Sequence, residues 1–148
     1  MSLIALDTNV LVKAFRDDDA AGDALRALLA HRASRGSSFA VPVFCVGEFW
    51  KIVTDRRAPI RVSPTKAFAW VDHLLTEGAF LIAPGSRYWQ TLRSLLAARL
   101  PAGTGVFDCE IAALCSEHGI REIWTFDRAF VKHPQLRAVD PLTRPEGG

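Results

Sequence analysis

Cysteine is scarce in this sequence, and the number and spacing of the cysteines argue against a disulfide framework and a thiolate zinc site. The chain of 148 residues has three cysteines, at positions 45, 109 and 115, and no C-x-x-C pair. An odd count does not build a disulfide framework, and a structural zinc site bound by thiolates needs closely spaced pairs. Each cysteine stands among apolar neighbours, so we expect three buried free thiols.

Long apolar runs and an export signal are also missing. No run approaches the roughly 20 apolar residues that cross a bilayer. The N-terminus does not combine a basic region, an apolar stretch and a small-residue cleavage site, so we expect a cytoplasmic protein. Apolar residues make up 49% and charged residues 23% of the sequence, which is the balance of a globular protein. We expect a single domain over residues 1–148, with a frayed tail at 142–148.

Neither sign of charge is in marked excess. The formal net charge is +2, which by itself does not indicate a nucleic-acid partner. Arginine outnumbers lysine by 14 to 4, and the arginine fork is the better match to a phosphate group.

Apolar runs alternate with segments of helical periodicity along the chain. Runs at residues 3–6, 39–43, 79–84, 122–126 and 136–141 predict strands, and helical spacing predicts helices at 20–35, 43–55, 64–77, 86–100 and 106–119. Residues 10–15 fit a short helix or a turn. Strands that alternate with helices are typical of an α/β sandwich with a mainly parallel sheet.

Four carboxylates interrupt apolar segments. Asp7 follows the first predicted strand, and Asp127 follows the fourth. Glu48 lies early in a helix beside Phe49, and Asp108 opens another helix. Because ligands of open α/β sheets bind beyond the carboxyl ends of the strands, where the strand order reverses, we expect Asp7 and Asp127 to share one crevice if their strands are neighbours.

Taken alone, each of these acids has an ordinary structural explanation. Asp7 suits a turn or cap, Glu48 a partner for the helix dipole, Asp108 an N-cap and Asp127 the end of a strand. The acidic run at residues 17–19 is interpreted in the same way, as a cap for the helix at 20–35.

Only the four acids together point to a metal. Carboxylates in apolar settings are costly unless they are paired or bound to a cation. A hard divalent ion such as Mg²⁺ or Mn²⁺ prefers oxygen ligands. Such sites typically act on phosphate esters, because the ion orients a water molecule and neutralises developing charge.

The motifs LDTNVL, GEF, VFDCEIAALC and WTFDRAF, in this order, resemble the PIN-domain family, and most of all its VapC-type toxin branch. The resemblance covers almost the whole chain. It implies a three-layer α/β/α fold with a five-stranded parallel sheet. It also implies a metal-dependent endoribonuclease that is usually a homodimer and is blocked by a small antitoxin.

By position, Asp7, Glu48, Asp108 and Asp127 match the acidic quartet of the family. The resemblance implies that Asp7, Asp108 and Asp127 hold Mg²⁺ or Mn²⁺. Asn9 and Thr125 match polar residues that commonly support the quartet, since an amide and a hydroxyl can hold carboxylates and water molecules in place.

One position departs from the family pattern. The last motif often carries a second acid, and Ala129 stands at that position here. We therefore expect one tight metal site, with any second ion recruited by the substrate.

A ribonuclease must also bind the phosphate backbone of RNA near its acidic site. Lys13, Arg16, Arg128 and Lys132 flank the motifs and are candidates for phosphate contacts, although solvated surface charge explains each of them equally well.

Three alternatives remain open at this point. A haloacid-dehalogenase-type phosphohydrolase needs a second acid where Asn9 stands, so it is disfavoured. A PIN-like binding domain with a weakened site is favoured only by Ala129. A housekeeping RNA-processing nuclease would share the same chemistry with the toxin.

Overall fold

The structure, a computed structural model, describes residues 2–16, 18–128, 130 and 135–143. These residues form five strands, which make one sheet in the order β3-β2-β1-β4-β5. The strands are β1 (Leu3–Leu6), β2 (Ser38–Pro42), β3 (Phe80–Ile82), β4 (Glu122–Trp124) and β5 (Arg137–Val139). Every pairing is parallel, which confirms the predicted fold class.

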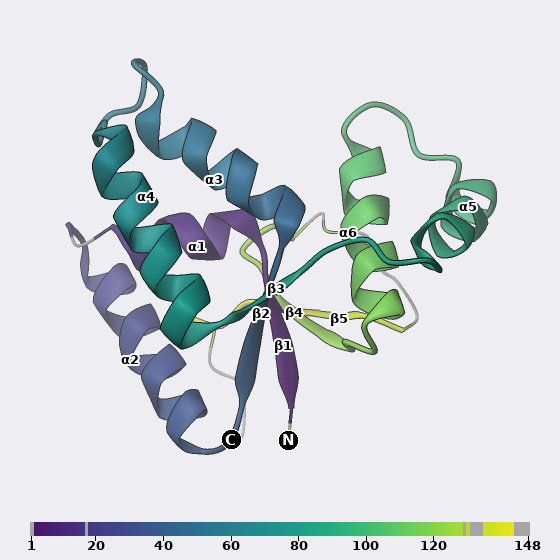
Figure 1. The fold of residues 1–148 in the computed structure, drawn as a ribbon, viewed down its shortest axis with the longest axis horizontal. Coiled ribbons are helices and arrows are strands. Elements are labelled where there is room, and N and C mark those ends of the chain that lie inside the picture. The colour runs from purple at the N-terminus through teal and green to yellow at the C-terminus, as the bar shows by residue number, and fades with distance from the viewer. Residues whose placement is uncertain (1, 17, 129, 131–134, 144–148) are drawn as a thin grey trace.

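Helices cover both faces of this sheet. They are α1 (Thr8–Phe15), α2 (Ala20–Ser34), α3 (Val43–Thr54), α4 (Pro64–His73), α5 (Tyr88–Arg99) and α6 (Gly105–Glu117). Helices α1 to α4 lie on one side of the sheet, and α5 and α6 lie on the other (Figure 1). The three-layer arrangement predicted by the family resemblance is therefore confirmed. Among the described helices, none has both the length and the apolar character that spanning a bilayer requires.

The strand order reverses at β1. The chain places β2 and β3 on one side of β1, then returns to place β4 and β5 on the other. Ile4, Ala5 and Leu6 of β1 are buried. The continuous apolar run at residues 3–6 predicted this burial, because it is typical of a strand covered on both faces. The β1–β4 boundary is therefore the switch point at which ligands bind in sheets of this kind.

Two predicted helix caps are present. Asp19 accepts a hydrogen bond from the backbone N–H of Gly22 at 2.6 Å, and Ser63 accepts one from Lys66 at 3.2 Å. The predicted helix at 64–77 is less regular than expected, because α4 ends at His73 and a π-helical turn, η1 (Leu74–Gly78), follows it.

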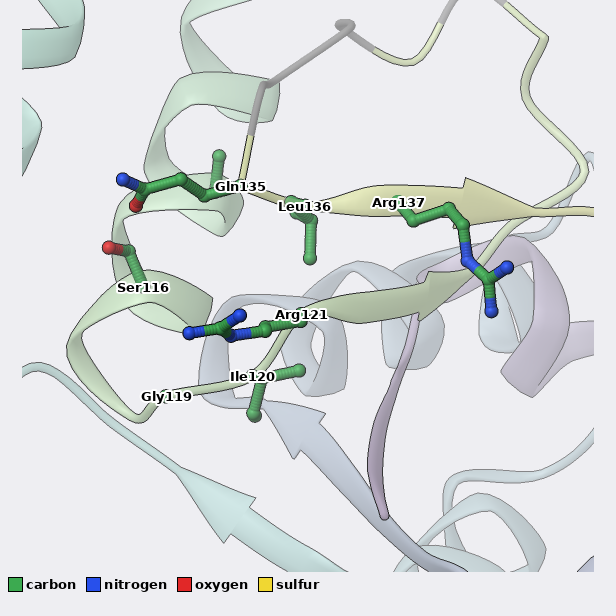
Figure 2. A pocket seen from close by; sticks show the side chains of 8 residues that line it. Ser116, Gly119, Ile120, Arg121, Gln135, Leu136 and Arg137 are labelled. Carbon is green, nitrogen blue, oxygen red and sulfur yellow. The ribbon is translucent and has the colours of Figure 1, made fainter.

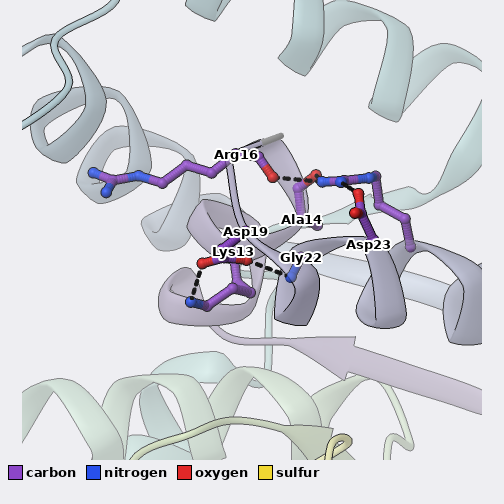
Figure 3. Close-up of polar contacts among 7 residues, drawn as sticks. Lys13, Ala14, Arg16, Asp19, Gly22 and Asp23 are labelled. Carbon is purple, nitrogen blue, oxygen red and sulfur yellow. Dashed lines mark hydrogen bonds and ion pairs between the residues drawn. The ribbon is translucent and has the colours of Figure 1, made fainter.

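Helices α1 and α2 meet at a polar clamp (Figure 3). The guanidinium of Arg26 donates to the carbonyl oxygens of Ala14 at 3.0 Å and Arg16 at 2.5 Å, at the end of α1, and it also pairs with Asp23. These bonds satisfy carbonyl groups that a helix end leaves without intrahelical partners. Gly22 allows the close approach, because a Cβ atom there would lie 2.7 Å from the carbonyl oxygen of Arg16.

We predict that Gly22→Ala destabilises the protein by about 1 to 3 kcal/mol, because the methyl group meets backbone that cannot move without opening the clamp. Gly47→Ala is the matched control. A Cβ atom at Gly47, inside α3, would meet no described atom within 4 Å apart from its chain neighbours and the backbone of its own helix. This substitution should stabilise the helix by about 0.5 to 1 kcal/mol. Urea unfolding of both variants measures the difference, and equal unfolding free energies would contradict the close approach.

Candidate functional site

The candidate site begins where β1 and β4 end. Leu6 pairs with Trp124 in the parallel register, and the backbone N–H of Asp7 donates to the carbonyl oxygen of Trp124 at 3.0 Å. The two strands are therefore direct neighbours, as the sequence argument required. This pairing brings Asp7 next to Thr125 and Asp127, which follow β4.

The hydroxyl of Thr125 organises this edge. It donates to Oδ2 of Asp7 at 2.7 Å and accepts the backbone N–H of Asp127 at 3.1 Å and the side-chain amide of Asn9 at 3.4 Å. A hydroxyl has one proton to donate and two lone pairs. Because both other partners are N–H donors, the single proton of Thr125 is directed to Asp7.

Asn9 joins the two strand ends a second time. Its amide oxygen accepts the backbone N–H of Phe126 at 3.1 Å, while its NH₂ group faces Thr125. A side chain in α1 is thus bonded to two consecutive residues after β4. The structure therefore places Thr125 in direct contact with Asp7, and Asn9 in contact with Thr125.

Asp7 has two roles, one for each carboxylate oxygen. Its side chain is the N-cap of α1, and Oδ1 accepts the backbone N–H of Thr8 at 2.8 Å. The polar break after β1 is therefore a helix start, two residues earlier than the short helix predicted at residues 10–15. The cap explanation for Asp7 describes its local structure correctly, and it leaves Oδ2 turned toward Thr125.

Burial raises the pKa of Asp7, and the negative charge of Asp127 raises it further, while the hydrogen bonds from Thr125 and Thr8 oppose that shift. A carboxylate that loses hydration beside a second carboxylate is stabilised by a cation. The electrostatics of this pair are those of a site that attracts positive charge.

Two of the three cysteines lie near Asp7, a neighbourhood that the sequence did not predict. Cys45 Sγ lies 4.0 Å from Asp7 Oδ1, and Cys45 and Cys115 are both buried free thiols, as is Cys109. Burial, with a further contribution from the negative charge of Asp7, raises the pKa of Cys45 and of Cys115 to about 12. Both thiols are therefore uncharged neighbours of the Asp7 carboxylate. The only signal for Cys45 was its place in the first turn of α3, directly after β2.

Glu48 approaches the same region from α3. Its negative charge, like that of Asp7, acts on the thiol of Cys45. The buried residues of this helix are Cys45, Phe49 and Val53, so position 48 lies off the buried stripe and Glu48 is exposed. Asp127 is exposed as well. The apolar neighbours of Glu48 and Asp127 in the sequence therefore do not bury these two acids.

Asp108 lies in the first turn of α6, where it is half-buried and not the N-cap. Helix α6 ends shortly before β4 begins, so it runs antiparallel to the strands and its first turn lies at their carboxyl edge. The first turn of α6, with Asp108, therefore lies at the edge of the sheet where β1 and β4 end.

The donors present are hard oxygen atoms, which is the chemistry that Mg²⁺ and Mn²⁺ prefer. Over the part of the chain that the structure describes, no three acidic, histidine or cysteine side chains converge closely enough to hold one ion. The pair formed by Asp7 and Asp127 still suits Mg²⁺, because this ion is usually bound by one or two carboxylates and keeps several water molecules.

The predicted RNA-binding residues have different surroundings. Lys13 is paired with Asp19 at 3.0 Å, and the side chain of Arg16 extends away from that pair (Figure 3). Arg128 is exposed. Lys132 lies outside the described residues, and so does Ala129, the position that departs from the family pattern. Phosphate contact by these four basic residues stays a prediction.

A hollow of about 480 Å³ lies at the opposite edge of the sheet (Figure 2). Its described lining is Ala112, Ser116, Gly119, Ile120, Arg121, Gln135, Leu136 and Arg137, from the end of α6 and the starts of β4 and β5. This lining includes two arginines and no carboxylate, so the hollow is separate in position and in charge from the candidate site.

Comparison with known proteins gives a consistent result. Residues 4–136 match the PIN domain family. VapC ribonuclease Mb2897 of Mycobacterium bovis is 31% identical over 142 residues, which cover 95% of this chain and 96% of that protein. VapC31 of Mycobacterium tuberculosis, also a ribonuclease, is 28% identical over 141 residues, covering 94% of this chain and 99% of that protein.

The fold also has solved counterparts. A structure of VapBC-1 from nontypeable Haemophilus influenzae superposes with a TM-score of 0.66 at 16% identity, over 95% of this chain and 99% of the other. This likeness confirms the fold.

We predict that Thr125→Val raises the pKa of Asp7 above its value in the unmutated, metal-free protein, because the hydrogen bond that lowers it is lost. Unfolding should also become easier by about 1 to 3 kcal/mol, since buried polar partners lose their bonds. Thr125→Ser, which keeps the hydroxyl, is the control. Carbon-13 NMR titration of the Asp7 carboxyl group measures the first effect, and an unchanged pKa in the valine variant would contradict the described network.

Proposed function

The chain belongs to the PIN domain family, in which it is related to VapC ribonucleases, and we propose that it is a Mg²⁺- or Mn²⁺-dependent endoribonuclease that acts as the toxin of a toxin–antitoxin pair. The observation that carries the proposal is the Thr125 hydroxyl, which holds Asp7 beside Asp127 at the switch point of the sheet. Members of this group that are named as ribonucleases match almost the whole chain.

The metal would be held first by Asp7 and Asp127, with Asp108 as a further ligand from α6. When bound, a divalent ion supplies Lewis acidity and lowers the pKa of a coordinated water molecule. Its positive charge would also relieve the repulsion between Asp7 and Asp127 that raises the pKa of Asp7. One tight site, as the sequence predicted from Ala129, agrees with this sparse set of donors.

The side chains of the protein divide the remaining work. Thr125 and the N-terminus of α1 fix the two oxygens of Asp7, so this carboxylate need not reorganise when substrate arrives. Glu48 is exposed on α3, so its carboxylate is accessible to solvent. We assign to it the acceptance of a proton from the attacking water molecule.

Partners are proposed on the same basis. The structural relatives include VapBC-1, and we propose a small cognate antitoxin and a homodimer for this chain in the cytoplasm. Large apolar side chains are available for such contacts, since Phe68 is 59%, Phe80 62% and Trp89 60% exposed. Exposed apolar groups of this size often mark surfaces that bind other proteins.

A catalytically weakened PIN-like binding domain is the second candidate. It is supported by the lack of a three-ligand cluster within the described residues and by Ala129. Tight Mn²⁺ binding that depends on Asp7, without cleavage of any RNA, would favour this candidate over the nuclease.

We predict that Asp7→Asn lowers Mg²⁺- or Mn²⁺-dependent RNA cleavage at least about 100-fold, which corresponds to ~2.7 kcal/mol of barrier. Asp72→Asn, the same substitution at an exposed position of α4, should leave cleavage unchanged. A single-turnover assay on total RNA, with circular dichroism to confirm folding, measures both variants. Full activity in folded Asp7→Asn would rule out the proposed metal mechanism.

A second prediction separates toxin from housekeeping nuclease. Expression of the unmutated chain alone should arrest bacterial growth, and co-expression of a small partner encoded next to it should restore growth. Asp7→Asn should be harmless at the same expression level. If active protein accumulates without slowing growth, the housekeeping role replaces the toxin role.

A further inference from the structure

We propose that the loop joining α3 to α4, residues 55–63, is a contact surface for the phosphate backbone of single-stranded RNA. This basic loop presents Arg56, Arg57 and Arg61, which are all exposed. The inference rests on the proposed ribonuclease function and identifies where a strand would be gripped beyond the acidic site. None of these arginines flanks the motifs that the sequence analysis considered.

Charge is strongly one-sided here. Residues 51–66 carry five basic side chains, and Lys51 and Lys66 at the ends of the segment are exposed like the three arginines. Asp55 is the single acid in this stretch, and it is bonded to the backbone N–H of Arg57 at 2.8 Å and to its guanidinium at 3.4 Å. The net field of the segment is therefore positive, although the whole chain carries only +2.

The loop is ordered by its own hydrogen bonds. The backbone N–H of Val62 donates to the carbonyl oxygen of Val53 at 2.9 Å and closes the base of the loop. Inside it, Ala58 N–H donates to the carbonyl oxygen of Asp55 at 3.0 Å. Arginines on a fixed turn lose less conformational entropy on binding than arginines on a mobile one, which favours binding.

The position of the loop relates it to the acidic site. Helix α3 starts directly after β2, at the carboxyl edge of the sheet, and Glu48 lies halfway along it. The basic loop follows the end of α3, at the tip of the α3–α4 hairpin (Figure 1). From Glu48 to the start of the loop the helix rises by about 10 Å at ~1.5 Å per residue. That span is about three nucleotides of a stacked strand at ~3.4 Å per phosphate.

Aromatic packing fixes this spacing. The ring of Phe49 in α3 stacks on Trp70 in α4 with centroids 5.0 Å apart, and Phe15 of α1 packs edge-on against both rings at 5.3 Å. Because α1 is the helix that Asp7 caps, the hairpin is held to the acidic site through a short rigid path.

The chemistry favours RNA over an acidic protein. Guanidinium groups bind phosphate through two parallel hydrogen bonds, and a strand repeats that group at short intervals. In the loop itself, Ile60 is the large apolar side chain that is exposed, whereas protein interfaces are built around apolar anchors. An acidic peptide is the competing partner, and the experiment includes it.

The test compares two double variants of the full chain that each remove two positive charges. Arg56→Gln/Arg61→Gln changes the basic loop and spares the pair formed by Arg57 and Asp55. Arg35→Gln/Arg121→Gln is the control, because both arginines are exposed near the starts of β2 and β4, at the opposite edge of the sheet. The control also removes Arg121 from the lining of the hollow at that edge.

Binding of a fluorescein-labelled single-stranded RNA is followed by anisotropy in EDTA, so that cleavage does not intervene. The loop variant should bind several-fold more weakly, and the slope of log K against log salt should become shallower by about 1.4, or ~0.7 for each lost phosphate contact. The control should match the unmutated chain. Equal losses in both variants, or a loss confined to the control, would overturn the proposal.

A parallel titration with a poly-glutamate peptide tests the competing partner. Loss of peptide binding with unchanged RNA binding in the loop variant would overturn the RNA assignment. Cleavage assays with Mg²⁺ separate this proposal from the ribonuclease function. If the unmutated chain cleaves RNA and the loop variant binds it normally, only the loop proposal fails. If no RNA is cleaved but binding depends on the loop, only the nuclease proposal fails.

Discussion

The hydroxyl of Thr125 is the contact on which the candidate site depends. Its one proton and two lone pairs are all used, and its partners come from the end of β1, the first turn of α1 and the turn after β4. This arrangement is possible only because β1 and β4 are parallel neighbours at the point where the strand order reverses. The fold therefore specifies the site through one hydrogen-bonded group.

Asp7 shows how structure and chemistry share one side chain. One oxygen begins α1, and the other faces Thr125 and the neighbouring charge of Asp127. Capping alone would be satisfied by an asparagine or a serine. A carboxylate held beside another carboxylate lowers the stability of the fold, and a bound cation would offset the repulsion between them. The neutral thiols of Cys45 and Cys115 keep the surroundings apolar without adding charge.

The parts of this fold that sequence could predict are those set by local rules. The continuous apolar run of β1, the caps Asp19 and Ser63, and the alternation of strands with helices all depend on near neighbours. Sequence could also place Asp7 and Asp127 at one edge, given parallel neighbouring strands. It could not fix the exposure of Glu48, because a shift of one residue around a helix moves a side chain off the buried stripe. The contact between Cys45 and Asp7 depends on how α3 leaves the sheet, which no local pattern encodes.

The single backbone bond between Val62 and Val53 has an evolutionary consequence. It closes the loop at its base, so the residues between Val53 and Val62 can be lengthened, shortened or replaced far from Asp7. Insertions in such a surface loop carry only a small entropic penalty. The length and sequence of this loop can therefore vary without a change at the acidic site.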